Sequence, residues 1–138
     1  MTVLADTGAV YALIDRSDAW HERVVAWWSA GRRPAVLLPE IILPEVCYLL
    51  ATRIGSRAEN AFVRAIVRGE FELELLEEED IRRAAALMAA YESLPLRFVD
   101  AAITAMAERL ESTALLTTDR RHFSVIRPRH AEGFDLLP

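Results

Sequence analysis

The stretch from Phe98 to Phe123 constrains the fold more than any other part of the chain. It predicts a helix that starts near Phe98, followed by a short buried strand over Ala114–Thr117. Asp100 lies at the start of this helix, and Asp119 comes just after the strand. Open parallel sheets bind their ligands in the crevice at the carboxyl ends of the strands. Asp119 is therefore expected to lie at such a ligand site.

The beginning of the chain repeats the arrangement of a strand that ends on a carboxylate. Val3–Ala5 predicts a short apolar strand, and Asp6 follows it directly. Ala35–Leu38 is apolar throughout, which fits a strand buried on both faces, whereas the alternation in Phe71–Leu75 indicates an edge strand. Helical segments separate these strands, so the chain predicts a three-layer α/β/α fold with a mostly parallel sheet of four to five strands. Phe134–Leu136 is a candidate for the fifth strand.

Composition narrows the class of protein. With 138 residues, 53% of them hydrophobic, the chain is expected to form a single domain over residues 1–138. It shows no apolar run long enough for a membrane span and no basic, apolar leader, and its one cysteine, Cys47, cannot form an internal disulfide. These features favour a cytoplasmic protein without a membrane partner.

The absence of lysine excludes two classes of phosphate-binding protein. The net charge is −5, and all 16 basic residues are arginine. Without lysine, a Walker-type phosphate loop is excluded. A phosphorelay receiver also places aspartates at strand ends, but it needs a paired acidic dyad and a lysine, and this chain has neither.

Four carboxylates carry the predicted chemistry: Asp6, Glu45, Asp100 and Asp119. Taken singly, each has a structural explanation: Asp6 and Asp100 as helix N-caps, Asp119 as a turn residue, and Glu45 as a surface residue. Together they are expected to converge on one sheet edge, where they would repel unless protonated or bound to metal. Hard oxygen ligands suit Mg²⁺ or Mn²⁺ rather than Zn²⁺. Three histidines show no metal-ligand spacing and are expected either at the surface or behind the ligands, in contact with them but not with the metal: His21, His122 and His130.

Several motifs occur in the order and at the spacing typical of one family. They are V-L-A-D-T-G-A at the start, D-x-x-H-E from Asp18, P-E-V from Pro44, F-V-D-A-A-I from Phe98, and L-L-T-T-D-R-R-H-F from Leu115. With these motifs the chain resembles PIN-domain toxins of the VapC type over nearly its whole length.

This resemblance implies a PIN-like fold and a metal-dependent endoribonuclease that cleaves cellular tRNA or rRNA and is held silent by a VapB-like antitoxin. By position, the four acids would be the catalytic residues that bind Mg²⁺, with Mn²⁺ as a substitute, and Thr117 would help to order the site. Glu40 matches less well than Glu45 and stays outside the set. The alternative is a catalytically silent PIN-like scaffold that only binds a protein partner.

The resemblance also points to a homodimer, for which the helices after Glu40 offer apolar side chains. Those expected at the interface are Tyr48, Leu49, Phe62 and Ile66. The antitoxin is expected to cross the acidic cleft and the first two helices, where three tryptophans form part of an apolar face: Trp20, Trp27 and Trp28.

Overall fold

Five short strands form one parallel sheet in the computed structural model, which describes residues 1–138. The strands are β1 (Thr2–Ala5), β2 (Ala35–Pro39), β3 (Glu72–Glu74), β4 (Ala114–Leu116) and β5 (Asp135–Leu137). Their order in the sheet is β3-β2-β1-β4-β5, and every neighbouring pair is parallel. The predicted α/β/α architecture is confirmed, and the edge position predicted for the third strand holds as well.

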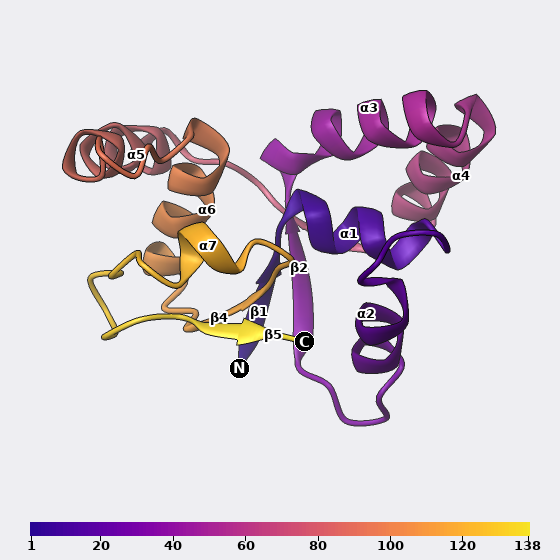
Figure 1. Ribbon diagram of the computed structural model, residues 1–138, viewed down its shortest axis with the longest axis horizontal. Coiled ribbons are helices and arrows are strands. Elements are labelled where there is room, and N and C mark those ends of the chain that lie inside the picture. The colour runs from indigo at the N-terminus through magenta and orange to yellow at the C-terminus, as the bar shows by residue number, and fades with distance from the viewer.

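Helices cover both faces of the sheet (Figure 1). On one side lie α1 (Thr7–Ile14), α2 (His21–Trp28), the short 3₁₀ helix η1 (Glu40–Ile42), α3 (Leu43–Arg53) and α4 (Ser56–Val67). On the other side lie α5 (Glu78–Ala90), α6 (Phe98–Arg109) and α7 (Arg120–Phe123). Right-handed crossovers explain this division, because the chain moves from β1 towards β3 and then reverses towards β5. None of the helices combines the length and the apolar character needed to cross a membrane.

The reversal of strand order lies between β1 and β4, at the centre of the sheet. Leu4 pairs with Leu115, and Ala5 pairs with Leu116. One step further, the backbone N–H of Asp6 donates to the carbonyl of Leu116 at 3.0 Å. The residues that follow the two strands therefore emerge side by side, at the point where doubly wound sheets bind their ligands.

Helix α6 runs through the core rather than over it. Seven consecutive residues, Ala101–Ala107, are buried, and four of them are alanine. A helix that is apolar on all sides is typical of a fully enclosed position, and small side chains allow neighbouring elements to approach closely. Asp100 directly precedes this buried run, so its backbone is held by the core of the protein.

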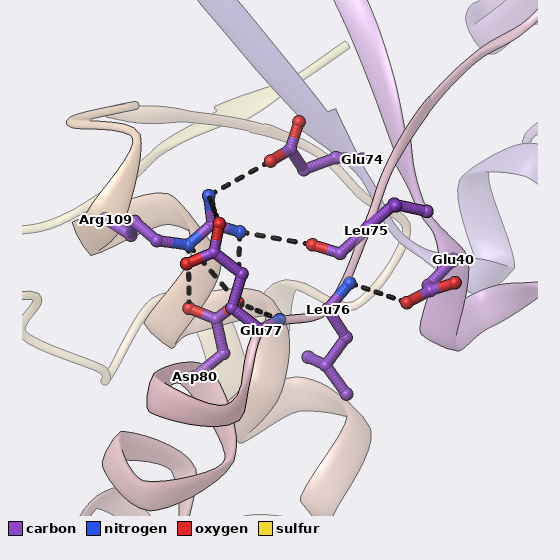
Figure 2. Close-up of polar contacts among 7 residues, drawn as sticks. All are labelled: Glu40, Glu74, Leu75, Leu76, Glu77, Asp80 and Arg109. Atoms are coloured by element: carbon purple, nitrogen blue, oxygen red, sulfur yellow. Dashed lines mark hydrogen bonds and ion pairs between the residues drawn. The ribbon is translucent and has the colours of Figure 1, made fainter.

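The far end of α6 is fixed by a charged cluster around Arg109 (Figure 2). The Arg109 guanidinium donates to both oxygens of Asp80, with the shortest contacts at 3.0 Å, and to Glu74 Oε1 at 3.0 Å. Asp80 is only 2% exposed, and these acceptors raise the pKa of Arg109. Close by, Glu40 Oε1 accepts the N–H of Leu76 at 2.7 Å. Glu40 thus binds the connection between β3 and α5, outside the acidic pocket described below.

Two local predictions about α4 are wrong. The spacing of Ser56 and Glu59 predicts a capping box with Ser56 as the N-cap, but Ser56 is already the first helical residue and the N-cap is Gly55, with no side-chain cap. Gly55 has a φ of 143°, which favours glycine at this entry to the helix. Phe62, expected at a dimer interface, is instead buried and packs edge-on against Phe71.

Asp18 as a cap and Gly31 as a stop predict a second helix over Ala19–Ala30, but α2 spans only His21–Trp28. The carboxylate of Asp18 accepts the N–H of Trp20 at 2.8 Å and so stabilises the turn before the helix. The tryptophans of this region are partly buried and pack against the core, which leaves a smaller aromatic surface than expected: Trp20, Trp27 and Trp28.

Candidate active site

A polar pocket opens at the carboxyl ends of β1 and β4, with a volume of about 330 Å³. All four carboxylates predicted from the sequence line it: Asp6, Glu45, Asp100 and Asp119. They come from four different parts of the chain, namely the ends of two strands and the first turns of α3 and α6. The remaining lining residues are Thr7, Gly8, Arg97, Phe98, Val99, Ile103 and Thr118.

Asp6 is held through both of its carboxylate oxygens. It is the N-cap of α1, and its Oδ1 accepts the backbone N–H of Ala9 at 2.8 Å. Its Oδ2 accepts the hydroxyl of Thr117 in a short hydrogen bond. Since Asp6 is only 7% exposed, these two donors replace most of the water that a carboxylate binds in the unfolded chain.

Thr117 connects the two central strands at the floor of the site. Its side chain is fully buried, directly after β4. While its hydroxyl donates to Asp6, its oxygen accepts the backbone N–H of Asp119 at 2.8 Å. One hydroxyl therefore fixes the side chain of one acid and the backbone of another.

Asp119 is the N-cap of α7, and both of its oxygens contact His122. Oδ1 accepts the backbone N–H of His122 at 3.0 Å, and Oδ2 lies 2.8 Å from the ring nitrogen Nδ1. Ligand atoms of Asp100, Asp119 and His122 all lie within 4.8 Å of one another. From the sequence, His122 was expected outside the ligand set. Its position three residues after Asp119, at the start of a helix, is the local feature that brings the two side chains within reach of each other.

Asp100 and Glu45 both lie in the first turn of a helix. The N-cap of α6 is Arg97, so Asp100 is not a capping residue. Glu45 is exposed on α3, and its Oε1 accepts the hydroxyl of Thr7 at 2.7 Å. Arg97 is the basic residue among those that line the pocket, and the sequence analysis did not single it out.

Crowding and burial shift the pKa values of two acids upward. Burial raises the pKa of Asp6 to about 7, with a further contribution from Asp100 and Asp119, against hydrogen bonds from Thr117 and Ala9 that lower it. Burial and then the charge of Asp119 raise the pKa of Asp100 to about 6, while His122 opposes this. Negative charge in this pocket is therefore costly without a cation.

The donor set fits a hard divalent cation. Four side chains offer carboxylate oxygens to the pocket, and such oxygens are the ligands that Mg²⁺ and Mn²⁺ prefer. A cation in the pocket would offset part of the cost of keeping the buried Asp6 and Asp100 charged. Zn²⁺ favours sites rich in histidine and cysteine, whereas the pocket is lined by carboxylates.

Comparison with known proteins agrees with this geometry. The sequence pattern of the family described as PIN domain matches residues 3–127. The chain belongs to the PIN-domain family. A relative, ribonuclease VapC26 of Mycobacterium tuberculosis, is 32% identical over 136 residues, which cover 99% of this chain and 100% of that protein. This similarity assigns the PIN domain of the chain to the VapC type.

Solved structures show the same fold. The sarcin-ricin loop cleaving toxin VapC20 of Mycobacterium tuberculosis superposes with a TM-score of 0.77 at 23% identity, covering 85% of this PIN-domain chain and 89% of that chain. VapBC2 of Rickettsia felis, bound to a DNA fragment from its promoter, gives a TM-score of 0.71 at 13% identity, with 100% of both chains covered.

Proposed function

We propose that this PIN-domain protein is a metal-dependent endoribonuclease, a single domain over residues 1–138 that acts in the cytoplasm as the toxin of a type II toxin–antitoxin pair. The observation that carries the proposal is the convergence of four carboxylates in one pocket at the switch point of the sheet. The names of two similar proteins, ribonuclease VapC26 and the sarcin-ricin loop cleaving toxin VapC20, support RNA as the substrate. Structured cellular RNA, either tRNA or rRNA, is the proposed class.

The metal ligands in this proposal are Asp6, Glu45, Asp100 and Asp119. When bound there, Mg²⁺ or Mn²⁺ activates water as a nucleophile and stabilises the negative charge that develops on a phosphodiester. The protein contributes a fixed arrangement of oxygens. The hydroxyl of Thr117 orients Asp6 and, through the backbone, Asp119.

Glu45 is suited to a second role beside metal binding. It is more exposed than the other three acids, and the hydroxyl of Thr7 holds one of its oxygens. Its other oxygen remains free to accept a proton from an attacking water molecule and so to orient that water. Arg97, exposed at the pocket, is placed to pair with a phosphate of the RNA next to the one that is cleaved.

The partner in this proposal is a VapB-like antitoxin. VapBC2 of Rickettsia felis, which shares the fold, supports a complex of this kind. The net charge of −5 and the acidic pocket favour a basic antitoxin side chain that enters the pocket and neutralises the carboxylates. A partner that inhibits fully without any Arg or Lys near the pocket would contradict this part of the proposal.

Homodimerisation is proposed through α3 and α4. Of the side chains expected at the interface, Tyr48 is exposed, whereas Leu49 and Ile66 are partly buried and pack against the core. Large apolar side chains are exposed on the two helices and directly after α3: Tyr48, Ile54, Val63 and Val67. Tyr48 is 67% exposed and Val67 is 82% exposed, so these two side chains do not pack on the core and are available to a partner. A monomer mass in solution at micromolar concentration would contradict the dimer.

The test of the function separates a nuclease from a silent scaffold. Purified protein is incubated with total cellular RNA in Mg²⁺, in EDTA, and in EDTA followed by excess Mg²⁺, and its melting temperature is measured with and without Mn²⁺. The proposal predicts cleavage that EDTA stops and Mg²⁺ restores, together with a rise in melting temperature on addition of Mn²⁺. RNA that stays intact while Mn²⁺ leaves the melting temperature unchanged would support the scaffold.

A further inference from the structure

His122 contacts Asp119 twice, by two different groups. Its backbone N–H reaches Oδ1 at 3.0 Å, and its ring nitrogen Nδ1 reaches Oδ2 at 2.8 Å. The backbone contact belongs to the N-cap of α7 and exists for any residue at this position. The ring contact depends on histidine and therefore needs a separate explanation.

The ring contact fixes how the Asp119 carboxylate is oriented. A carboxylate only accepts hydrogen bonds, so Nδ1 carries the proton and donates it. Each oxygen of a carboxylate has two lone pairs, and each oxygen of Asp119 uses one of them for His122. The second lone pair of each oxygen remains for the pocket that Asp119 lines. Without the ring, only Oδ1 would be held, and the carboxylate could rotate about its last side-chain bond.

We propose that His122 is a positioning residue, whose Nδ1–H holds the Asp119 carboxylate in the orientation that binds the divalent cation. This inference rests on the proposed function for the cation site. Groups that hydrogen-bond to metal ligands orient them, and their removal typically weakens metal binding or activity by about 10–100-fold. His122 is half-buried, with 25% of its side chain exposed, which suits a fixed ring better than a freely moving one.

A different interpretation is that the ring leaves Asp119 and binds the cation itself, since the ligand atoms of His122, Asp119 and Asp100 lie within 4.8 Å of one another.

Three substitutions of His122 separate the two interpretations. His122→Asn places an amide N–H at the same number of bonds from the backbone as Nδ1. His122→Gln places its amide one bond further out, near Nε2, and His122→Ala removes the ring. Arg121→Ala, at an exposed position on the same helix, is the matched control.

The primary measurement is the dissociation constant of Mn²⁺ for the purified full chain, by titration calorimetry without RNA. We expect His122→Ala to weaken Mn²⁺ binding by about 10–100-fold, His122→Gln to behave like His122→Ala, and His122→Asn to recover most of the affinity. Arg121→Ala should bind like the parent. All four variants should melt close to the parent without metal, because the backbone N–H that caps α7 is kept.

Several results would overturn the inference. Equal affinity of His122→Ala and the parent would remove the ring from metal binding, and recovery by Gln rather than Asn would assign it as a ligand. A parent that binds no Mn²⁺ would overturn both this inference and the proposed function. A parent that binds Mn²⁺ but cleaves no RNA would overturn the nuclease alone, since the affinities of the variants still decide the role of His122.

Discussion

Replacing Thr117 with valine tests whether a single hydroxyl holds the site together. Valine keeps the shape of threonine but cannot hydrogen-bond, so Thr117→Val removes a donor from Asp6 and an acceptor from the backbone N–H of Asp119. Thr117 is fully buried, and valine has nearly the same shape, so we expect packing to be kept. The loss therefore falls on one buried carboxylate and one partly buried N–H rather than on packing.

The size of the effect follows from these two losses. A hydrogen bond to a charged group contributes about 1.5–3 kcal/mol, and a buried N–H without a partner costs about 1–3 kcal/mol. Asp6 escapes part of this cost by taking up a proton, because the Thr117 hydroxyl lowers the pKa of Asp6 and its removal raises that pKa above about 7. We therefore expect Thr117→Val to lower the free energy of unfolding by about 2–4 kcal/mol at neutral pH, and to weaken Mn²⁺ binding.

The assay is urea unfolding of parent, Thr117→Val and Thr117→Ser, with and without Mn²⁺. Serine keeps the hydroxyl, so Thr117→Ser should retain the Mn²⁺ affinity of the parent and lose only the contacts of one methyl group. A valine variant as stable as the parent that also binds Mn²⁺ equally well would refute the role of the hydroxyl. So would a serine variant as damaged as the valine variant.

Two further predictions concern pH and the far end of α6. The pKa of Asp6 is raised from 3.8 to about 7, and that of Asp100 from 3.8 to about 6. At a pH between the ordinary and the raised pKa, the metal-free folded state therefore binds more protons than the unfolded state. Unfolding in EDTA should accordingly show stability that falls as pH rises from about 4 to 7, whereas calorimetric Mn²⁺ affinity should rise over the upper part of this range; a flat profile would contradict the burial of Asp6. Arg109→Met leaves the buried Asp80 without its cation and should lower the free energy of unfolding by about 3–5 kcal/mol, measured in urea. A loss within error would mean that the cluster in Figure 2 is not needed for stability.

The sequence predicted the features that depend on local pattern. Apolar strands ending at Asp6 and just before Asp119, separated by helical segments, were sufficient to predict a parallel sheet and to expect both acids at one edge. For Asp6 and Asp119 the inference succeeds because the ends of parallel strands meet whatever the details of packing. Asp100 was assigned from its place at the start of an apolar helix, and Glu45 was chosen over Glu40 by the resemblance to the VapC family.

The missed features depend on tertiary neighbours. Nothing local shows that Arg97 lines the pocket, because this depends on how the loop before α6 approaches β1 and β4. Phe62 was assigned to an interface as one of the apolar side chains that the helices after Glu40 offer, but the sequence does not show that Phe71 packs against it. The contact between His122 and Asp119 lay within reach of the sequence, since their spacing is local, but only the structure shows the ring turned towards the carboxylate.

The most direct measurement compares the parent with Asp100→Asn on total cellular RNA at matched Mg²⁺, with the cleaved ends mapped. Asparagine preserves size, and by removing one charge from the crowded pocket it should leave the metal-free protein at least as stable as the parent. A neutral amide oxygen is a poorer ligand for Mg²⁺ than a carboxylate. We expect defined cleavage sites for the parent and none for the folded variant. A variant that cleaves the same sites at the rate of the parent would contradict the acidic pocket as the catalytic centre.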